Sequence, residues 1–333
     1  MMLQTRDLAI GYRRRGRPDN VLARALNLRL QPGELVGLLG PNGVGKSTLL
    51  RTLGGGQQPL AGRVLLGESD VARLKPQERA RRLSMVTTAA PRPRLMSGYA
   101  LVALGRHPHT DWLGRLTADD HSIIARALDA VKGAELAEQP VAELSDGQRQ
   151  KLMIARALAQ QSDIMLLDEP TAFLDLPRRI ETMALLKRLA RTTELAILVS
   201  THDLDLALRN CDRFWLMSRA SIKAGAPEDL ALDGSLGATF RAEGVHFDQR
   251  RGSFELEASH GTSVYVPGSS APAIWLRRAL TRAGYALAEE PGRIEISHRQ
   301  NDRGSSWRLQ IQDQTSRHAT IEAALQALER ETT

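Results

Sequence analysis

One segment of the chain has the residue types of a phosphate-binding loop. GPNGVGKST follows the pattern G-x-x-x-x-G-K-[ST], in which glycines let backbone N–H groups converge on phosphate oxygens without obstruction by Cβ atoms. Lys46 would supply a positive charge for the β- and γ-phosphates, and the Ser47 hydroxyl is placed to ligate Mg²⁺. The loop residues expected to bind a nucleotide are Gly40, Pro41, Asn42, Gly43, Val44, Gly45, Lys46, Ser47 and Thr48.

Two further apolar runs end in side chains suited to nucleotide hydrolysis. In IMLLDEP four apolar residues are followed by Asp168 and Glu169, and LAILVSTHD contains His202 after its apolar residues. Ligands of open α/β sheets bind at the carboxyl ends of the strands, so these side chains are expected at one sheet edge. We expect Asp168 to help hold Mg²⁺ and Glu169 to orient and deprotonate a water molecule. His202 is expected to hydrogen-bond the γ-phosphate or that water.

A second anion-binding pattern, LSDGQRQ, lies far along the chain from the first. It places Ser145 and Gly147 before KLMIARALAQ, a run that predicts a helix. A serine hydroxyl and free backbone N–H groups at a helix N-terminus favour an anion. One chain therefore carries two phosphate-binding patterns that are well separated in sequence.

The elements that must position these residues follow from hydrophobic periodicity. Apolar runs at 7–12, 25–30, 34–40, 164–168 and 195–200 read as strands, and 46–53 reads as a helix. Short buried strands alternating with helices predict a largely parallel sheet wrapped by helices. Between about 89 and 158 the strand signals fade, which predicts a helical insertion in an α/β core.

The remainder of the chain is expected to form a small α+β domain. After GAPEDLALDGSLGATF, strand patterns (SFELEA, TSVYV, RIEIS, WRLQI) occur with two helical patterns, APAIWLRRALTRAGY and TIEAALQALER. The predicted domains are therefore 1–240 and 245–333. Trp275, Leu276 and Leu280 recur at helical spacing and are expected in the core of the second domain.

The composition limits the classes of protein to consider. A hydrophobic fraction of 42% is ordinary for a globular chain of 333 residues, and the single cysteine, Cys211, excludes an internal disulfide framework. No apolar stretch approaches the roughly 18 residues that cross a bilayer. The net charge of +7 admits an acidic partner, such as a nucleic acid or a lipid surface, or only a solvated basic surface. Aromatic residues at 4% weaken recognition of nucleic acid by stacking.

GPNGVGKST, LSDGQ, IMLLDEP, AFLD and STHD together resemble, in order and spacing, the nucleotide-binding subunits of ATP-binding cassette (ABC) transporters. The resemblance covers residues 1 to about 240. It implies an α/β fold in which an ABC-type P-loop ATPase core has a helical subdomain at about 89–158, with ATP and Mg²⁺ as cofactors. Tyr12 stands where the family has an aromatic residue that stacks on adenine.

The resemblance also implies a role for the second phosphate pattern. In this family two cassettes close head to tail on two ATP molecules, so the signature loop of one chain grips the nucleotide of the other. Ser145, Gly147, Gln148 and Asp175, the last residue of AFLD, would then bind the partner's nucleotide. One set of motifs per chain implies a homodimer.

VALGRHPHTDWLGRLTADD resembles a segment of iron-siderophore, haem and cobalamin importers that lies near the permease. Its matching residues are Gly105, Arg106, Pro108, Trp112, Leu113 and Gly114. The resemblance implies an ATPase that powers a separate permease importing iron chelates, at the cytoplasmic face of the inner membrane, with a separate cargo-binding protein and no nucleic acid. Two alternatives remain: a soluble ABC ATPase of iron–sulfur assembly or of nucleic acid, and a regulatory protein that holds ATP without turnover.

Two positions depart from the family pattern. Asp146 replaces the first glycine of the usual signature, and its carboxylate must turn away from a triphosphate. Thr88 stands where a glutamine would sense the γ-phosphate and Mg²⁺, and its hydroxyl would reach the metal only through water. We expect altered coupling between nucleotide and partner, with ATP binding kept. The C-terminal domain is expected to stabilise the pair or to regulate hydrolysis.

Overall fold

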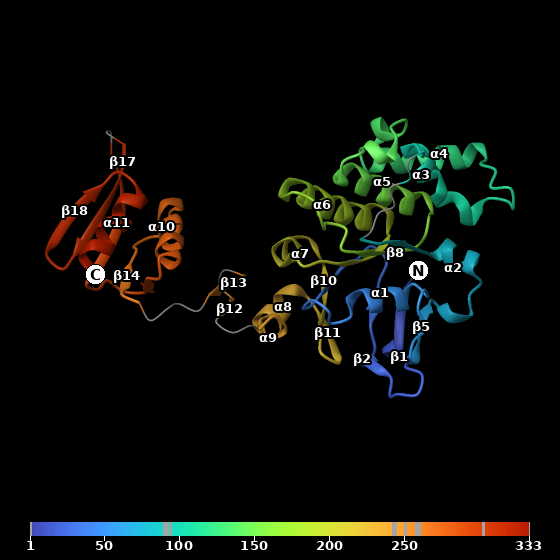
Figure 1. Ribbon diagram of the computed structural model, residues 1–333, viewed down its shortest axis with the longest axis horizontal. Helices are drawn as coiled ribbons and strands as arrows, with labels where there is room; N and C mark the ends of the chain where they lie inside the picture. The colour runs from blue at the N-terminus through green and yellow to red at the C-terminus, as the bar shows by residue number, and fades with distance from the viewer. Residues whose placement is uncertain are drawn as a thin grey trace. The chain divides into compact units, whose positions relative to one another are not determined.

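The fold is taken from a computed structural model that describes residues 2–88, 93, 95–241, 245–249, 252–256, 261–301 and 304–332. These residues divide into two units, the first within 1–242 and 247–254 and the second within 243–246 and 255–333 (Figure 1). Each unit has its own hydrophobic core.

The first unit is built on a six-stranded sheet in the order β11-β10-β4-β9-β8-β7. The pairs from β10 to β7 are parallel, and β11 is antiparallel to β10. Every residue of β4, β8 and β9 is buried, as expected for parallel strands covered on both faces. The strands are β4 (Leu35–Leu39), β7 (Leu83–Val86), β8 (Ile164–Asp168), β9 (Ala196–Ser200), β10 (Arg213–Ser218) and β11 (Ser221–Gly225).

A second, antiparallel sheet belongs to the same unit. Its order is β2-β1-β5-β6, with β3 also paired to β1. The predicted strand at 7–12 lies in β1, whereas the one predicted at 25–30 is divided between the end of β2 and β3. Both belong to this antiparallel sheet, which the expectation of one largely parallel sheet did not include. β1 and β2 pair antiparallel as a hairpin whose connection is residues 13–19. The strands are β1 (Leu3–Tyr12), β2 (Asn20–Leu26), β3 (Arg29–Leu30), β5 (Ala61–Leu66) and β6 (Ser69–Asp70).

Helices cover both faces of the central sheet. α1 packs among residues of β1, β4, β8 and β9, whereas α6 shares a second cluster with β4, β8, β9 and the helical segment. α6 begins after Asp175, whose carboxylate accepts a hydrogen bond from the N–H of Arg178 at 3.0 Å. The helices are α1 (Lys46–Leu53), α2 (Pro76–Arg82), α6 (Leu176–Thr193), α7 (Leu204–Asn210), α8 (Pro227–Leu232) and α9 (Ser235–Thr239).

The segment predicted to be helical contains α3 (Gly98–Ala103), α4 (Ala118–Ala130) and α5 (Asp146–Ala159), which pack on one another. Leu104–His109, Ala134–Leu136 and Val141–Glu143 add 3₁₀ turns, as Val71–Arg73 does before α2. Capping boxes formed by Thr117 and Ser145 fix the starts of α4 and α5. The predicted start of this segment, 89–92 and 94, lies outside the described residues.

The second unit is a five-stranded sheet in the order β15-β14-β16-β17-β18, with α10 and α11 packed on it. Leu276 and Leu280 lie in the core, as predicted, but Trp275 is 60% exposed, so its predicted core position is wrong. Adjacent helical residues differ by about 100° in direction, which puts Trp275 beyond the edge of the buried stripe. The elements are β14 (Ser263–Tyr265), α10 (Ala271–Arg282), β15 (Ala286–Ala288), β16 (Ile294–Asn301), β17 (Gly304–Ile311), β18 (Gln314–His318) and α11 (Ile321–Thr332).

The stretch of chain between the two units contains a short hairpin formed by β12 (Val245–Asp248) and β13 (Ser253–Leu256). Phe247 and Phe254 contact each other, and Phe254 also contacts Phe240 of the first unit. The first unit therefore takes 247–254 from the segment that the sequence assigned to the C-terminal domain. Among the described helices, none has the length and hydropathy required to cross a bilayer.

Candidate functional site

The phosphate-binding pattern forms the connection between β4 and α1. Its lysine, Lys46, is buried at 6% exposure and donates hydrogen bonds from Nζ to the carbonyl oxygens of Gly40 at 2.8 Å and Pro41 at 3.2 Å. A Cβ atom on Gly40 would lie 2.3 Å from the Met217 carbonyl oxygen, and the φ of Gly40 is 155°. Glycine is therefore required here, where β10 approaches the loop closely.

Opposing charges surround the buried lysine. Burial lowers the pKa of Lys46, and the carboxylates of Glu169 and Asp168 raise it, with burial the larger effect. A polyanion in the loop would add a favourable partner for the ammonium group, as a phosphate-binding lysine requires.

The carboxyl ends of three neighbouring strands are joined by hydrogen bonds. Ser200, at the end of β9, donates from Oγ to Asp168 Oδ1 at 2.8 Å and accepts from the N–H of Glu169 at 2.9 Å. Thr88, which follows β7, donates from Oγ1 to the Asp168 carbonyl oxygen at 2.8 Å. Asp168 is 9% exposed. Asp168 is therefore held by Ser200 of β9 on one side and by Thr88 after β7 on the other. One of its carboxylate oxygens accepts the hydrogen bond from Ser200.

Glu169 and His202 contact each other at the same sheet edge. Nε2 of His202 is hydrogen-bonded to Oε1 of Glu169, and both residues line one cavity with the phosphate loop. Glu169 has φ 51°, in the left-handed region. Such a backbone is unfavourable for a side chain with a Cβ atom and is found at sites where the surrounding structure imposes it.

The cavity has a volume of about 370 Å³. Tyr12 lies at its rim, where its hydroxyl is 2.8 Å from Thr48 Oγ1. Asn20 and Leu22 of β2 also line it, and neither was predicted from the sequence. Asn20 pairs with Tyr12 across the β1–β2 hairpin. The Gly- and Pro-containing segment after Tyr12 was the sequence signal that could have predicted this hairpin, and with it the position of Asn20. The lining residues are Tyr12, Asn20, Leu22, Asn42, Gly43, Gly45, Lys46, Ser47, Thr48, Glu169 and His202.

The second phosphate pattern lies apart from this cavity. Ser145 Oγ accepts from the N–H of Gln148 at 3.3 Å, and Gln148 Oε1 accepts from the N–H of Ser145 at 2.9 Å. Gly147 faces α6 beside Arg178, and Asp175 caps α6. None of the four predicted residues of this group is among those lining the cavity beside the phosphate loop of the same chain.

The carboxylate of Asp146 has a partner within its own helix. It forms an ion pair with the guanidinium of Arg149, which is 4% exposed and also donates to the Leu144 carbonyl oxygen at 3.1 Å. The sequence predicted that the Asp146 carboxylate must turn away from a bound phosphate. Its ion pair with Arg149 is consistent with that prediction, because the guanidinium compensates the negative charge of the carboxylate.

The turn containing Arg106 is anchored from within the protein. Arg106 is 5% exposed; its guanidinium donates to Asp120 at 2.7 Å and to the Ala159 carbonyl oxygen at 2.7 Å. The side chain of Arg106 is therefore buried, and the expectation that this segment lies near a permease stays a prediction. Trp112, farther along the same segment, is 90% exposed, and Leu113 is exposed too.

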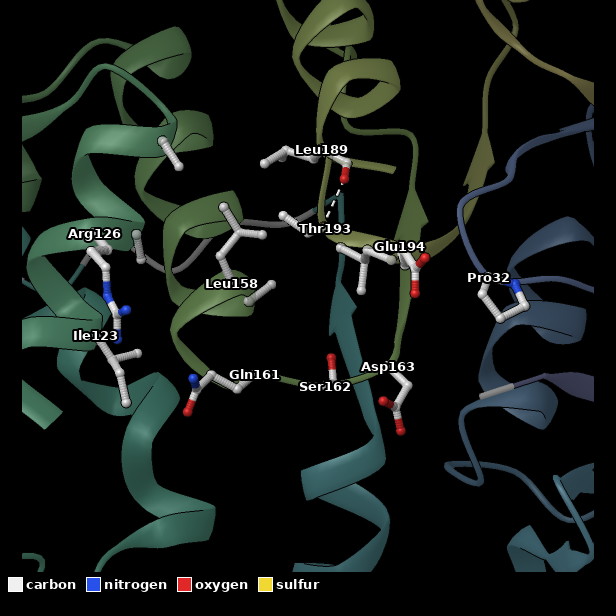
Figure 2. Close-up of a pocket in the computed structure, with 14 residues that line it drawn as sticks. Pro32, Ile123, Arg126, Leu158, Gln161, Ser162, Asp163, Leu189, Thr193 and Glu194 are labelled. Atoms are coloured by element: carbon white, nitrogen blue, oxygen red, sulfur yellow. Dashed lines mark hydrogen bonds between the residues drawn. The ribbon is translucent and has the colours of Figure 1, made fainter. Parts of the chain in front are cut away.

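A larger cavity, of about 520 Å³, lies at the opposite edge of the central sheet (Figure 2). Asp163 and Leu195, which precede β8 and β9, line it. Arg126 approaches from α4 on one side and Glu194 from the end of α6 on the other. The predicted nucleotide residues follow the carboxyl ends of the strands, so this cavity is separate from the phosphate loop.

Known families match both units of the chain. The family described as ABC transporter matches residues 23–172, and the family described as iron ABC transporter C-terminal domain matches residues 260–329. An uncharacterized ABC transporter ATP-binding protein of Methanocaldococcus jannaschii is 40% identical over 77% of this chain and 87% of the relative.

Other relatives have assigned functions. The cobalamin import ATP-binding protein BtuD of Halobacterium salinarum is 36% identical over 79% of this chain and 68% of its own length. The iron(3+)-hydroxamate import ATP-binding protein FhuC of Bacillus subtilis is 39% identical over 62% and 75%.

A solved dimeric ATP-binding cassette in a post-hydrolysis state, bound to ADP and Pi, is similar to this fold. It superposes with a TM-score of 0.58 at 26% identity, covering 67% of this chain and 98% of that one. The chain belongs to the ABC transporter ATP-binding proteins, which are ATPases that bind ATP and couple its hydrolysis to transport.

Proposed function

We propose that this chain hydrolyses ATP to power a separate membrane permease that imports iron chelates. The observation that carries the hydrolytic part is the Glu169–His202 contact in the cavity that also contains Lys46. The cargo class is supported by the C-terminal match to an iron transporter domain and by relatives named for import of iron(3+)-hydroxamate and cobalamin. Iron chelates and cobalamin are both large metal complexes, so the relatives agree on the type of cargo.

The donor set at the sheet edge fits Mg²⁺. Ser47 offers a hydroxyl, Asp168 offers the carboxylate oxygen not used by Ser200, and Thr88 can accept through water because its proton is directed to the Asp168 carbonyl. Hydroxyl, carboxylate and water oxygens are the ligands that Mg²⁺ prefers. Mg²⁺ held there would neutralise charge on the β- and γ-phosphates.

The protein side chains would carry the remaining steps. Lys46 binds the β- and γ-phosphates, and the ring of Tyr12 stacks on adenine at the cavity rim. Glu169 orients a water molecule and takes its proton as the water oxygen bonds to the γ-phosphorus and the bond to ADP breaks. His202 holds the Glu169 carboxylate in place through their hydrogen bond.

The active assembly would be a head-to-tail homodimer. Ser145, Gly147, Gln148 and Asp175 lie outside the cavity of their own chain, and the first three lie at the N-terminus of α5, where a helix favours an anion. A second copy would bring these groups to the γ-phosphate and complete the site. We place the dimer at the cytoplasmic face of the membrane, with a separate cargo-binding protein on the other side.

The permease would contact the segment around Trp112. This side chain and Leu113 are exposed apolar groups on a segment anchored by the buried Arg106. A large aromatic side chain on an otherwise polar surface is typical of an interface anchor.

The decisive experiment uses Glu169→Gln, which keeps the side-chain shape and removes the base. We expect ATP turnover to fall by about 10²–10⁴-fold with ATP binding retained, and Mg·ATP to shift the variant from monomer to dimer. Glu194→Gln, an exposed glutamate at the opposite sheet edge, is the matched control and should leave both properties unchanged. Unchanged turnover in Glu169→Gln would exclude the assigned base.

Transport is tested by co-purification from the native host. Tagged Glu169→Gln protein, trapped with ATP in solubilised membranes, should retain a polytopic permease at equal stoichiometry, and Trp112→Ala should lose it. Recovery of an iron–sulfur assembly complex or nucleic acid in its place would replace the importer with a soluble ATPase. Such a result would leave the hydrolytic site intact.

A further inference from the structure

The C-terminal sheet has one face that the described helices leave uncovered. α10 and α11 pack on the face that contributes Ile294, Ile296 and Leu309 to the core. Alternate residues of the strands point to the opposite side, and we call that side the outer sheet face. The residues that form it include Tyr265, Glu295, Ser297, Arg299, Ser306, Arg308, Gln310, Thr315 and Arg317.

Strand register gathers three arginines on this face. Arg308 of β17 is directly opposite Arg317 of β18. Arg299 of β16 is opposite Ser306, so Arg299 and Arg308 are diagonal neighbours across the pair. Diagonal positions are about 7–8 Å apart, within reach of long side chains. Like charges directly opposite one another destabilise a sheet, and an anion between them would remove that repulsion.

No described carboxylate forms an ion pair with these three guanidinium groups. Arg308 donates to Gln310 Oε1 at 3.2 Å and to Thr315 Oγ1 at 3.5 Å, both neutral acceptors, and its Nε has no hydrogen-bond partner. Glu295, the acidic residue of this face, lies opposite Gln310 and diagonal to Arg308. The face is therefore cationic, although residues 255–333 as a whole contain slightly more Asp and Glu than Arg and Lys.

Three kinds of partner can be compared for their fit to this cationic face. Cytoplasmic loops of a permease are enriched in Lys and Arg, and would be repelled. A sheet that binds single-stranded nucleic acid needs several aromatic side chains for stacking, and Tyr265 is the one aromatic residue among the described residues of this face. The cytoplasmic lipid leaflet carries a negative surface potential, and its phosphates accept paired hydrogen bonds from guanidinium groups.

We propose that the outer sheet face binds the anionic phospholipid headgroups of the membrane that holds the permease. The inference rests on the proposed function, which places the chain at that membrane. The binding chemistry follows from the strand register that brings Arg299, Arg308 and Arg317 together. An open sheet face presents its side chains in nearly one surface, which suits a lipid layer better than an enclosed ligand.

The test is sedimentation of the full chain with vesicles, without permease or nucleotide. Vesicles of phosphatidylcholine with about a third phosphatidylglycerol should bind the wild-type chain, and pure phosphatidylcholine should not. Each basic residue near such a surface contributes about 1 kcal/mol, which is about fivefold in partitioning. Arg308→Gln combined with Arg317→Gln should therefore weaken binding about 25-fold, and roughly 1 M salt should abolish wild-type binding.

The matched control removes the same charge from the helical side of the unit. Arg282→Gln combined with Arg330→Gln, both exposed and at the ends of α10 and α11, should bind vesicles like the wild type. Ser306→Asp, which leaves all three arginines in place, should weaken binding at the outer sheet face. It keeps the test decisive if the double arginine variant does not fold.

Several outcomes would overturn the proposal. Equal loss in the control pair would show a general charge effect, and equal binding to both vesicle types would exclude headgroup charge. Stabilisation of the wild type by about 10 mM inorganic phosphate, absent in Arg308→Gln, with no vesicle binding would identify a soluble anion as the ligand. Because no permease is present, these results are independent of the co-purification that tests the importer.

Discussion

Removing the charge of Asp120 should destabilise the helical segment by about 3 kcal/mol. Its carboxylate, 5% exposed, accepts hydrogen bonds from the Thr117 N–H at 2.9 Å and hydroxyl at 2.7 Å and from Arg106 Nε at 2.7 Å. These contacts, those of Thr117 first, lower the pKa of Asp120 from 3.8 to about 2. Asp120→Asn keeps the side-chain shape and leaves the buried guanidinium of Arg106 without its counter-charge.

The magnitude follows from two limits. A pKa lowered from 3.8 to about 2 corresponds to about 2.5 kcal/mol of stability at neutral pH, because each pKa unit is worth about 1.4 kcal/mol. Breaking a buried ion pair by removing one partner destabilises proteins by about 3–5 kcal/mol. Arg106 keeps its bonds to Ala159 and Gln161, so we expect about 3 kcal/mol, at the lower end of the second range and close to the first value.

Urea unfolding followed by circular dichroism, with hydrogen exchange of residues 104–130, measures the loss. Asp119→Asn is the matched control, since Asp119 is exposed in the same helical turn and should change stability by less than about 0.5 kcal/mol. The folded-state pKa is depressed, so the difference between wild type and Asp120→Asn should be full above about pH 4 and vanish as pH falls toward 2. A variant equal to wild type at pH 7 would refute the structural role of this pair.

Three further results are expected. Tyr12→Ala should weaken ATP binding about tenfold, measured by calorimetry, whereas Tyr12→Phe keeps the stacking ring and should change the Kd less than threefold; equal losses would contradict stacking. Thr88→Gln should change the ATPase rate and transport of the assembled importer, and no change in either would contradict altered coupling at this position. Burial raises the pKa of Cys211 to about 12, so Ellman's reagent should leave it unmodified at pH 8 until urea unfolds the chain; rapid labelling of the native protein would contradict that burial.

The sequence predicted best what depends on neighbouring residues. The phosphate loop lies between a strand and a helix that begins at Lys46, because glycine content, apolar pattern and helix propensity all act within a few residues. Glu169 and His202 were predicted at one sheet edge because parallel strands end together, and they are in contact. The use of Ser145 in a partner's site stays a prediction.

Features set by tertiary packing were harder to predict. Asn20 and Leu22 line the cavity because β2 folds back on β1, but irregular register between Leu8, Ile10 and Gly11 prevents counting across the hairpin. Hydrophobic periodicity predicts which side of a helix is buried, but it does not predict how far around the helix the buried side extends. The wrong prediction for Trp275, which lies just outside that buried side, follows from this. The burial of Arg106 was not visible in sequence, since its counter-ion lies on another helix.

The anchored turn before Trp112 has a consequence for the energetics of recognition. Arg106 is bonded to two other parts of the segment, and the Pro108 carbonyl oxygen accepts from Gln77 at 3.0 Å and Arg81 at 2.9 Å. The backbone that leads to the exposed indole is therefore ordered before any partner arrives. A preorganised surface loses little conformational entropy on association. More of the contact free energy made by Trp112 would then appear as affinity, and complex formation would require little rearrangement of this chain.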